Sequence, residues 1–260
     1  MPDLSARETR FTEIFAAGGS ADIARALPVE APVALEFNGI AYAVMMATPA
    51  HLSDFVTGFA ITEGLVRSTA DIAGIDIAET DKGWIIRAQL VPEAAGPVME
   101  RARRRVSESS CGLCGIENLE HIARPLPRIA VPLGVEPRAV FAALGALGDH
   151  QPLGRRTAAV HAAAFCDLSG AILAAREDIG RHNALDKLFG ALAARGIPAA
   201  DGFVLLTARC SYELVEKTVV AGARALATIS APTTLAIDRA RQAGLALHVL
   251  TREDSLLRAM

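Results

Sequence analysis

Hydrophobic and polar residues alternate in the first half of the chain and then recur at helical spacing. Two alternating runs flank Asn38-Gly39, a dipeptide suited to a type I′ turn, and predict a hairpin. Further runs predict strands over 72–77 and 84–90, then a helix from Pro97. A helix ending near Gly64 is expected to pack on the hairpin through Leu52, Phe55, Val56, Phe59 and Ala60.

The second half alternates apolar runs of strand length with amphipathic helical patterns. The expected strands cover 158–165, 172–175, 203–207, 226–229 and 245–250. The expected helices cover 180–194, 211–224 and 232–243. This alternation is typical of a layered α/β domain with largely parallel strands, in which ligands bind at the carboxyl ends of the strands.

These patterns divide the chain into three parts. Residues 1–27 are polar, contain adjacent glycines, and predict a flexible arm without regular structure. Residues 28–124 predict a smaller α+β domain. A proline-rich stretch starts at Pro125 and marks a boundary, so residues 125–260 predict the layered α/β domain.

Composition and charge exclude several classes of protein. The 260 residues are 52% hydrophobic but only 5% aromatic, which favours a core of small aliphatic side chains. A formal net charge of −3 gives no field that would hold a nucleic-acid backbone. The opening segment does not resemble a signal peptide, and no apolar run is long enough to span a membrane. We therefore expect a cytoplasmic protein that binds neither membranes nor nucleic acid.

The chain has four cysteines, too few for a disulfide scaffold, and two of them form the motif Cys111-Gly-Leu-Cys114. Such a pair suits sulfur or redox chemistry, metal binding or a structural role. A zinc site would need ligands from Cys166, Cys210 or a histidine. Zinc deaminases place a proline before this motif and use a separate His-x-Glu. No proline precedes Cys111 and no such glutamate follows His161, so deaminase catalysis is disfavoured.

The other two cysteines offer less chemistry. Cys210 lies between a predicted strand and a predicted helix. It is either a second reactive thiol or a small buried residue, which is the commoner case at such turns. Cys166 ends an apolar strand and is expected in the core. The run Arg101 to Arg105, upstream of Cys111, either lowers the pKa of the thiols there or lies on a solvated helix face.

A second candidate site lies at the N-terminus of the helix predicted from residue 180. Arg181, His182 and Asn183 stand where backbone N–H groups bind phosphate or carboxylate. The structural alternative has Asp178 capping this helix and His182 paired with Asp186 one turn later. The residues alone leave both interpretations open.

Taken in order, these segments resemble the formate dehydrogenase accessory sulfurtransferase family, FdhD. The resemblance covers roughly residues 28–255, and its most specific parts are CGLCG and GRHNALDKL. The other matching segments are PVALEFNGIAYAVMMATPAHLSDFVTGFAITEGLV, VHAAAF, CSYELVEKTVVAG and ISAPTTLAIDRA.

The resemblance implies a cytidine-deaminase-like α/β fold and a homodimer. It also implies that a cysteine desulfurase donates persulfide sulfur, which passes to the bis(guanine dinucleotide) molybdenum cofactor for the catalytic subunit of formate dehydrogenase. Cys111 would carry the sulfur and Cys114 would assist. The cofactor would be bound as the sulfur acceptor, no permanent metal is expected, and the family's cofactor-binding segment falls on Leu250, Thr251, Arg252, Glu253, Asp254 and Ser255.

Two departures from the family's pattern concern glycine. The family often has Thr-Gly-Gly where this chain has Thr157-Ala158-Ala159, and its C-terminal segment usually carries a glycine that is absent from 250–255. The alternative hypothesis is a non-enzymatic nucleotide-binding or structural-zinc module. A thiol-disulfide oxidoreductase is disfavoured, because Cys111 does not lie between a strand and a helix in the thioredoxin manner.

Overall fold

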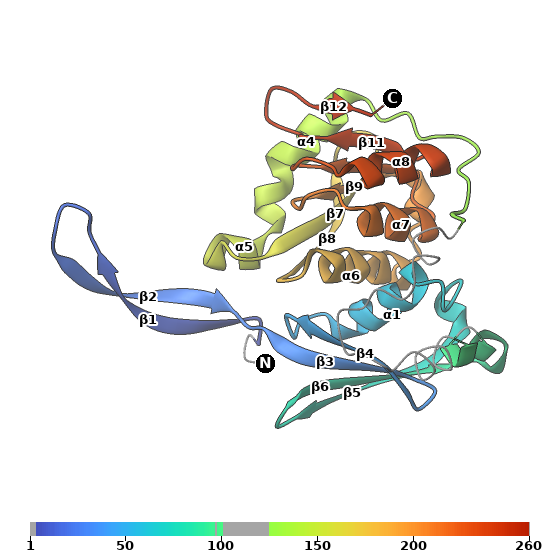
Figure 1. The fold of residues 1–260 in the computed structure, drawn as a ribbon, viewed down its shortest axis with the longest axis horizontal. Helices are drawn as coiled ribbons and strands as arrows, with labels where there is room; N and C mark the ends of the chain where they lie inside the picture. The colour runs from blue at the N-terminus through green and yellow to red at the C-terminus, as the bar shows by residue number, and fades with distance from the viewer. Residues whose placement is uncertain (1–3, 97, 101–124, 260) are drawn as a thin grey trace.

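The computed structural model describes residues 4–96, 98–100 and 125–259, which form two sheets with their helices and a projecting ribbon (Figure 1). Cys111, Cys114, Arg101 to Arg105 and the start of the helix expected at Pro97 lie outside these residues. Within the described residues, no helix is long and apolar enough to cross a bilayer.

The smaller half is a four-stranded sheet in the order β4-β3-β6-β5. Its strands are β3 (Ala31–Phe37), β4 (Ile40–Ala47), β5 (Ile72–Thr80) and β6 (Gly83–Leu90). Asn38 and Gly39 join β3 to the antiparallel β4 with φ angles of 50° and 77°, which confirms the predicted hairpin. Helix α1 (Leu52–Thr62) packs on this sheet, as expected, and buries Phe55 in its core.

The larger half is a six-stranded sheet in the order β12-β11-β10-β9-β7-β8. Its strands are β7 (His161–Cys166), β8 (Ile172–Asp178), β9 (Phe203–Leu206), β10 (Ala225–Thr228), β11 (Ala246–Val249) and β12 (Leu257–Arg258). Only the pairs β9–β10 and β10–β11 are parallel, so the expectation of a largely parallel sheet is wrong. Asp167 closes a tight turn after β7 by accepting the N–H groups of Ser169 and Ala171, and this turn is too short for a parallel crossover.

Helices cover both faces of this sheet. The three expected helices are α6 (Arg181–Ala194), α7 (Tyr212–Val220) and α8 (Thr234–Ala243), which share one core with Ala163 and Phe165. On the other face, α4 (Pro137–Leu147) shares a core with Ala164 and Cys166. Neither α4 nor the short α5 (Pro152–Thr157) was expected. With the alanine-rich α4, helices lie on both faces of the sheet.

The two halves meet where α1 crosses α6 (Figure 1). Two glycines bring the helix backbones together. A Cβ atom on Gly58 would lie 1.7 Å from the carbonyl oxygen of Asp186, and one on Gly190 would lie 1.9 Å from the carbonyl oxygen of Asp54. Side chains larger than hydrogen at either position would separate the helices.

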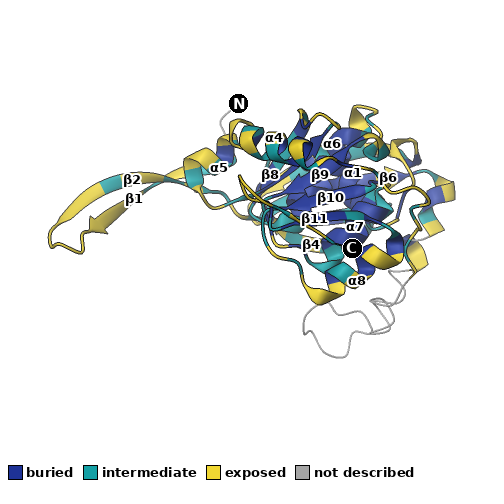
Figure 2. Ribbon diagram, turned by 90° about the horizontal axis from the view of Figure 1, so that it is seen from above, coloured by how far each residue is buried: buried dark blue, intermediate teal, exposed yellow. Residues whose placement is uncertain are grey.

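The first 27 residues differ from the arm without regular structure that their polarity predicted. Strands β1 (Ala6–Ile14) and β2 (Ser20–Pro28) pair antiparallel along their whole length. Gly18 and Gly19 adopt φ angles of 92° and 93°, which allow the tight reversal between the strands. The ribbon projects from the body and most of it is exposed (Figure 2).

Candidate functional site

The topology of the larger sheet brings both predicted binding segments to one edge. Strands β8 and β9 both run antiparallel to β7, and β10 and β11 continue parallel to β9. The carboxyl ends of β8, β9, β10 and β11 therefore lie together, at what we call the carboxyl edge. Arg181 to Asn183 follow β8 and Leu250 to Ser255 follow β11. The starts of α6, α7 and α8 border the same edge.

His161 lies at this edge, near the side chains of two arginines. His161 begins β7, and its strand starts where the neighbouring β9 ends. Burial lowers the pKa of His161, Arg181 adds to this effect, and His182 and Arg209 contribute less, while Asp178 opposes them. The side chains of Arg181 and Arg209 therefore lie within electrostatic range of the same imidazole, as suits a site for an anion.

His182 pairs with a carboxylate that the sequence did not suggest. Its Nε2 lies 3.7 Å from Oε2 of Glu213 at the start of α7, and the His182 imidazole holds the pKa of Glu213 at about 2. The expected pairing with Asp186 is wrong, because Lys217 contacts that carboxylate. Among the described residues, the buried atoms His182 Nε2 and Ser211 Oγ make no hydrogen bond of normal length, although both lie beside the Glu213 carboxylate. A bound ligand would supply partners for both atoms.

The C-terminal segment is anchored to the end of β10 and to the residue that follows it. Thr251 is fully buried, its N–H donates to the carbonyl of Thr228 at 3.1 Å, and its Oγ1 has no partner among the described residues. The guanidinium of Arg252 donates to the carbonyl of Ile229. Arg252 to Ser255 are exposed and close a turn, since the Arg252 N–H donates to the Ser255 carbonyl at 2.8 Å. These four residues therefore face solvent at the carboxyl edge.

Asn183 plays a different part from its neighbours. Its amide nitrogen donates to the carbonyl of Met46 at 2.8 Å and to Oδ1 of Asp178 at 3.0 Å. Asp178 also accepts the Gly180 N–H at 2.8 Å, so it fixes the turn before α6 rather than capping the first helical turn. Asn183 is almost completely buried and engaged within the protein, which leaves Arg181 and His182 as the accessible pair.

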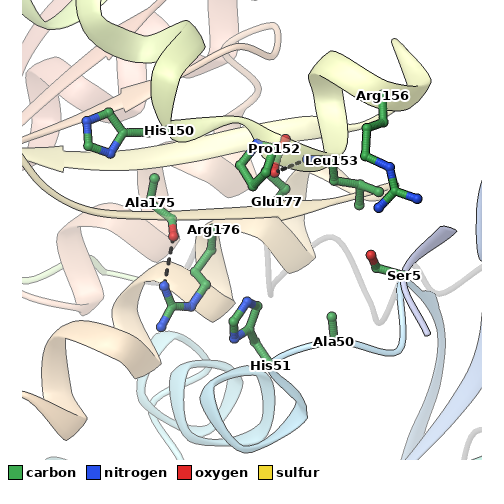
Figure 3. Close-up of a pocket in the computed structure, with 10 residues that line it drawn as sticks. All are labelled: Ser5, Ala50, His51, His150, Pro152, Leu153, Arg156, Ala175, Arg176 and Glu177. Atoms are coloured by element: carbon green, nitrogen blue, oxygen red, sulfur yellow. Dashed lines mark hydrogen bonds between the residues drawn. The ribbon is translucent and has the colours of Figure 1, made fainter. Parts of the chain in front are cut away.

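A cavity of about 300 Å³ lies between the base of the ribbon, the start of α1, α5 and β8 (Figure 3). Its main charges are already engaged. Arg176 donates to Asp54 at 2.8 Å, and Glu177 accepts backbone N–H groups at the start of α5, including that of Leu153 at 2.8 Å. His51 also lines the cavity, and its pKa is lowered by burial and then by Arg176. None of the residues predicted to bind the cofactor lines this cavity.

Comparison with known proteins places this geometry in a family. The family model described as FdhD/NarQ matches residues 28–257. This chain belongs to the FdhD/NarQ family. Its fold resembles that of a protein from Desulfotalea psychrophila described as a formate dehydrogenase accessory protein, with a TM-score of 0.76 and 19% identity over 97% of this chain and 96% of that one.

Curated members of the FdhD/NarQ family share much of the sequence. The sulfur carrier protein FdhD of Variovorax paradoxus is 45% identical over 229 residues, which cover 88% of this chain and 82% of that protein. The sulfur carrier protein FdhD of Agrobacterium fabrum is 44% identical over 231 residues, 88% of this chain and 85% of that protein. Both names describe a sulfur carrier.

Two of the four cysteines in this member of the FdhD/NarQ family are buried in the structure. Cys166 and Cys210 are fully buried, and burial raises the pKa of each thiol to about 12. Cys166 is a core residue, as expected, and the interpretation of Cys210 as a second reactive thiol is wrong. Cys111 and Cys114 lie outside the described residues, so their role stays a prediction.

Several residues of the carboxyl edge are not among the candidates predicted from the sequence. Arg209, Ser211 and Glu213 belong to a polar cluster after β9, in which Cys210 was the predicted candidate. The available signal was the position of that cluster between a strand and a helix, where ligands bind in α/β sheets. The pairing of His182 with Glu213, which are 31 positions apart, has no local signal.

Proposed function

We propose that this chain is a sulfur carrier that bears a persulfide on Cys111, with Cys114 assisting. The observation that carries the proposal is 45% identity over 229 residues to a protein named sulfur carrier protein FdhD. Cys166 and Cys210 are buried with raised pKa values, which leaves the Cys111-Gly-Leu-Cys114 pair for thiolate chemistry.

The proposed transfer uses ordinary thiolate exchange. The Cys111 thiolate attacks the terminal sulfur of a persulfide on a cysteine desulfurase, forms a new sulfur–sulfur bond and releases the desulfurase cysteine as a thiolate. The terminal sulfur would then pass to the acceptor, whose reduced molybdenum would supply two electrons and be oxidised in turn, while the electron pair of the broken sulfur–sulfur bond would stay on Cys111. Cys111 returns to the thiolate state.

The acceptor in this proposal is the bis(guanine dinucleotide) molybdenum cofactor, destined for the catalytic subunit of formate dehydrogenase. The carboxyl edge suits the phosphates of such a molecule, because Arg181 and Arg209 lie beside the N-termini of α6 and α7, and Arg252 follows β11 at the same edge. The unpartnered oxygen of Ser211 suits its polar groups. Within the predicted set, Arg181, His182 and Arg252 to Ser255 would make contact, while Asn183, Leu250 and Thr251 would fix the backbone.

Other parts of the proposal follow from the family resemblance. We propose a cytoplasmic homodimer without a permanent metal, and a cytidine-deaminase-like arrangement of the larger half. The strand order β8-β7-β9-β10-β11, with β7 antiparallel to both neighbours, supports that arrangement. The covering helices on both faces also support it.

Sulfur labelling tests the carrier role. We expect the purified chain to acquire label from a cysteine desulfurase supplied with sulfur-labelled cysteine. Cys111→Ser should abolish the label without changing the folding, whereas Cys210→Ser, at a buried thiol, should keep it. A Cys111→Ser protein that is charged like the wild type would overturn the proposal.

Nucleotide binding tests the acceptor site separately. Guanosine diphosphate is a suitable probe for one end of the cofactor, and calorimetry measures its affinity. We expect Arg181→Ala to weaken binding about tenfold, the usual size for loss of one charge-assisted contact. Arg241→Ala, in the last turn of α8, is the matched control and should leave the affinity unchanged. Equal affinity for Arg181→Ala and the wild type would remove Arg181 from the site.

A further inference from the structure

The ribbon of β1 and β2 leaves large apolar side chains in solvent. Phe11, Ile14 and Phe15 are 43%, 81% and 46% exposed. In the described part of the chain these strands form a sheet of two, and the ribbon extends away from the body (Figures 1 and 2). A two-stranded ribbon is marginally stable in water, whereas three or more strands with an apolar face are stable. The ribbon is therefore suited to pair with a further strand.

The edge of β1 is the more open of the two, because β2 also packs against α5. Hydrogen bonds at the ends of the ribbon set its pattern. The Phe15 N–H donates to the Gly19 carbonyl, and the Val29 N–H donates to the Ser5 carbonyl. Odd-numbered residues of β1 therefore bond to β2, and even-numbered residues direct their N–H and C=O groups outward. These outward groups form a template for another strand.

We propose that β1 pairs antiparallel with β1 of a second copy of this chain, about a twofold axis at Thr9. This register aligns the outward groups of Glu8 with those of Arg10 in the second copy, and Arg10 with Glu8. It also places Ile14 opposite Leu4 of the second copy, which is 43% exposed in the single chain. The two ribbons then form one sheet of four strands, β2-β1-β1-β2.

The charges of Glu8 and Arg10 favour this register and a second copy of the chain as the partner. A twofold interface must be self-complementary, and β1 carries Glu8 and Arg10 on the same face, separated by one residue. Moving the axis to Arg10 would set two arginines opposite each other, and moving it to Glu8 would set two glutamates opposite. The residues that face Glu8 and Arg10 on β2 are Ala26 and Ala24, whose small side chains leave both charges uncovered.

This pairing rests on the homodimer of the proposed function and locates its interface, while sulfur acceptance by Cys111 does not require it. The closing experiment therefore measures mass first and sulfur charging second. Charge variants in β1 that lose association but still accept sulfur would support the proposed interface and leave the carrier role intact. A chain that associates but fails to accept sulfur would contradict the carrier role and leave the interface intact.

Light scattering after gel filtration, over a range of concentrations, tests the proposed pairing in the full chain. The wild type should have twice the mass of one chain. Glu8→Arg and Arg10→Glu should each raise the dissociation constant about tenfold or more, because two attractive pairs become repulsive. The double variant Glu8→Arg/Arg10→Glu should restore the wild-type value. Glu13→Arg, whose directly opposite residue in this register is the uncharged Ser5, is the control and should have a much smaller effect.

A cysteine at the axis tests the register directly. Thr9→Cys should form a disulfide between copies on mild oxidation, and mass spectrometry should locate it between the two peptides that carry the substitution. Thr12→Cys, away from the axis, should not. A monomeric wild type, or a dimer whose dissociation constant the single charge reversals leave unchanged, would overturn the proposal.

Discussion

The ammonium of Lys187 lies 2.5 Å from the carboxylate of Asp178, and both side chains are completely buried. Burial lowers the pKa of Lys187, and the attraction of Asp178 opposes that shift. The pair also binds the backbone of Thr48 in the smaller half, since Lys187 donates to its carbonyl and Asp178 accepts its N–H. This ion pair therefore links the two halves immediately beside the carboxyl edge.

Removal of one member of this pair should be strongly destabilising. We expect Lys187→Met to lower the free energy of unfolding by about 3 to 5 kcal/mol, because Asp178 remains as an uncompensated buried charge. The double variant Asp178→Asn/Lys187→Met should lose less unfolding free energy than the sum of the losses in Asp178→Asn and Lys187→Met. Urea unfolding measures these three variants, and Lys82→Met in the exposed turn between β5 and β6 is the control. Additive losses would show that the two charges do not interact.

Burial of His248 predicts a loss of stability in acid. Burial, with a smaller effect from Arg258, lowers the pKa of His248 to about 4. As the pH falls below about 6.5, the unfolded chain binds a proton that the folded chain does not bind until about pH 4. Stability should therefore fall across this window, by at most about 3 kcal/mol from this residue.

His248→Gln should flatten that dependence, measured as the difference in unfolding free energy between about pH 7 and about pH 5. Burial also lowers the pKa values of His51 and His161, so part of the slope should remain. The exposed His150 offers a matched control through His150→Gln. An unchanged slope in His248→Gln would contradict the assignment.

The glycines missing from the family pattern have a physical consequence. Ala158 and Leu250 adopt φ angles of 52° and 50°, in the left-handed region where a Cβ atom is unfavourable. Ala158→Gly should therefore raise the free energy of unfolding, by about 0.5 to 1 kcal/mol. Ala159→Gly, next to it at a residue without a positive φ, should lower it instead. Thermal unfolding compares the two variants, and an Ala158→Gly protein less stable than the wild type would contradict the inference that the backbone at Ala158 is strained.

Thiol reactivity separates the buried cysteines from the proposed carrier pair. In the folded protein, Cys166 and Cys210 should resist alkylation, because their pKa values near 12 keep them protonated. Cys111 and Cys114 should be modified rapidly, and all four cysteines should react after unfolding. Peptide mass spectrometry assigns each modification. A tightly bound zinc ion that protects Cys111 and Cys114 would favour the structural-zinc alternative.

The parts of the fold that depend on local pattern could be predicted from the sequence. The Asn38-Gly39 hairpin, α1 and the three helices over the larger sheet were found, because apolar spacing and turn chemistry act over a few residues. The ribbon was missed because its strands have little apolar contrast and few buried side chains. Helix α4 was missed because its buried face consists mainly of alanine and valine.

The candidate site was predicted in part for the same reason. Arg181 and the segment from Leu250 to Ser255 follow strands, so strand order alone brings them to one edge. Asn183 has the same local setting as Arg181, yet it bonds to Met46, a residue 137 positions away. Long-range contacts of this kind decide whether a polar side chain faces a ligand or supports the fold, and local pattern does not encode them.

Mass spectrometry of the intact chain tests the carrier role most directly. The chain is incubated with a cysteine desulfurase and cysteine, and the added mass is then located by peptide mapping without reductant. We predict the addition of one sulfur atom on Cys111, absent after treatment with a thiol reductant and absent in Cys111→Ser. Sulfur found on another residue, or a Cys111→Ser protein that gains the same mass, would contradict the account.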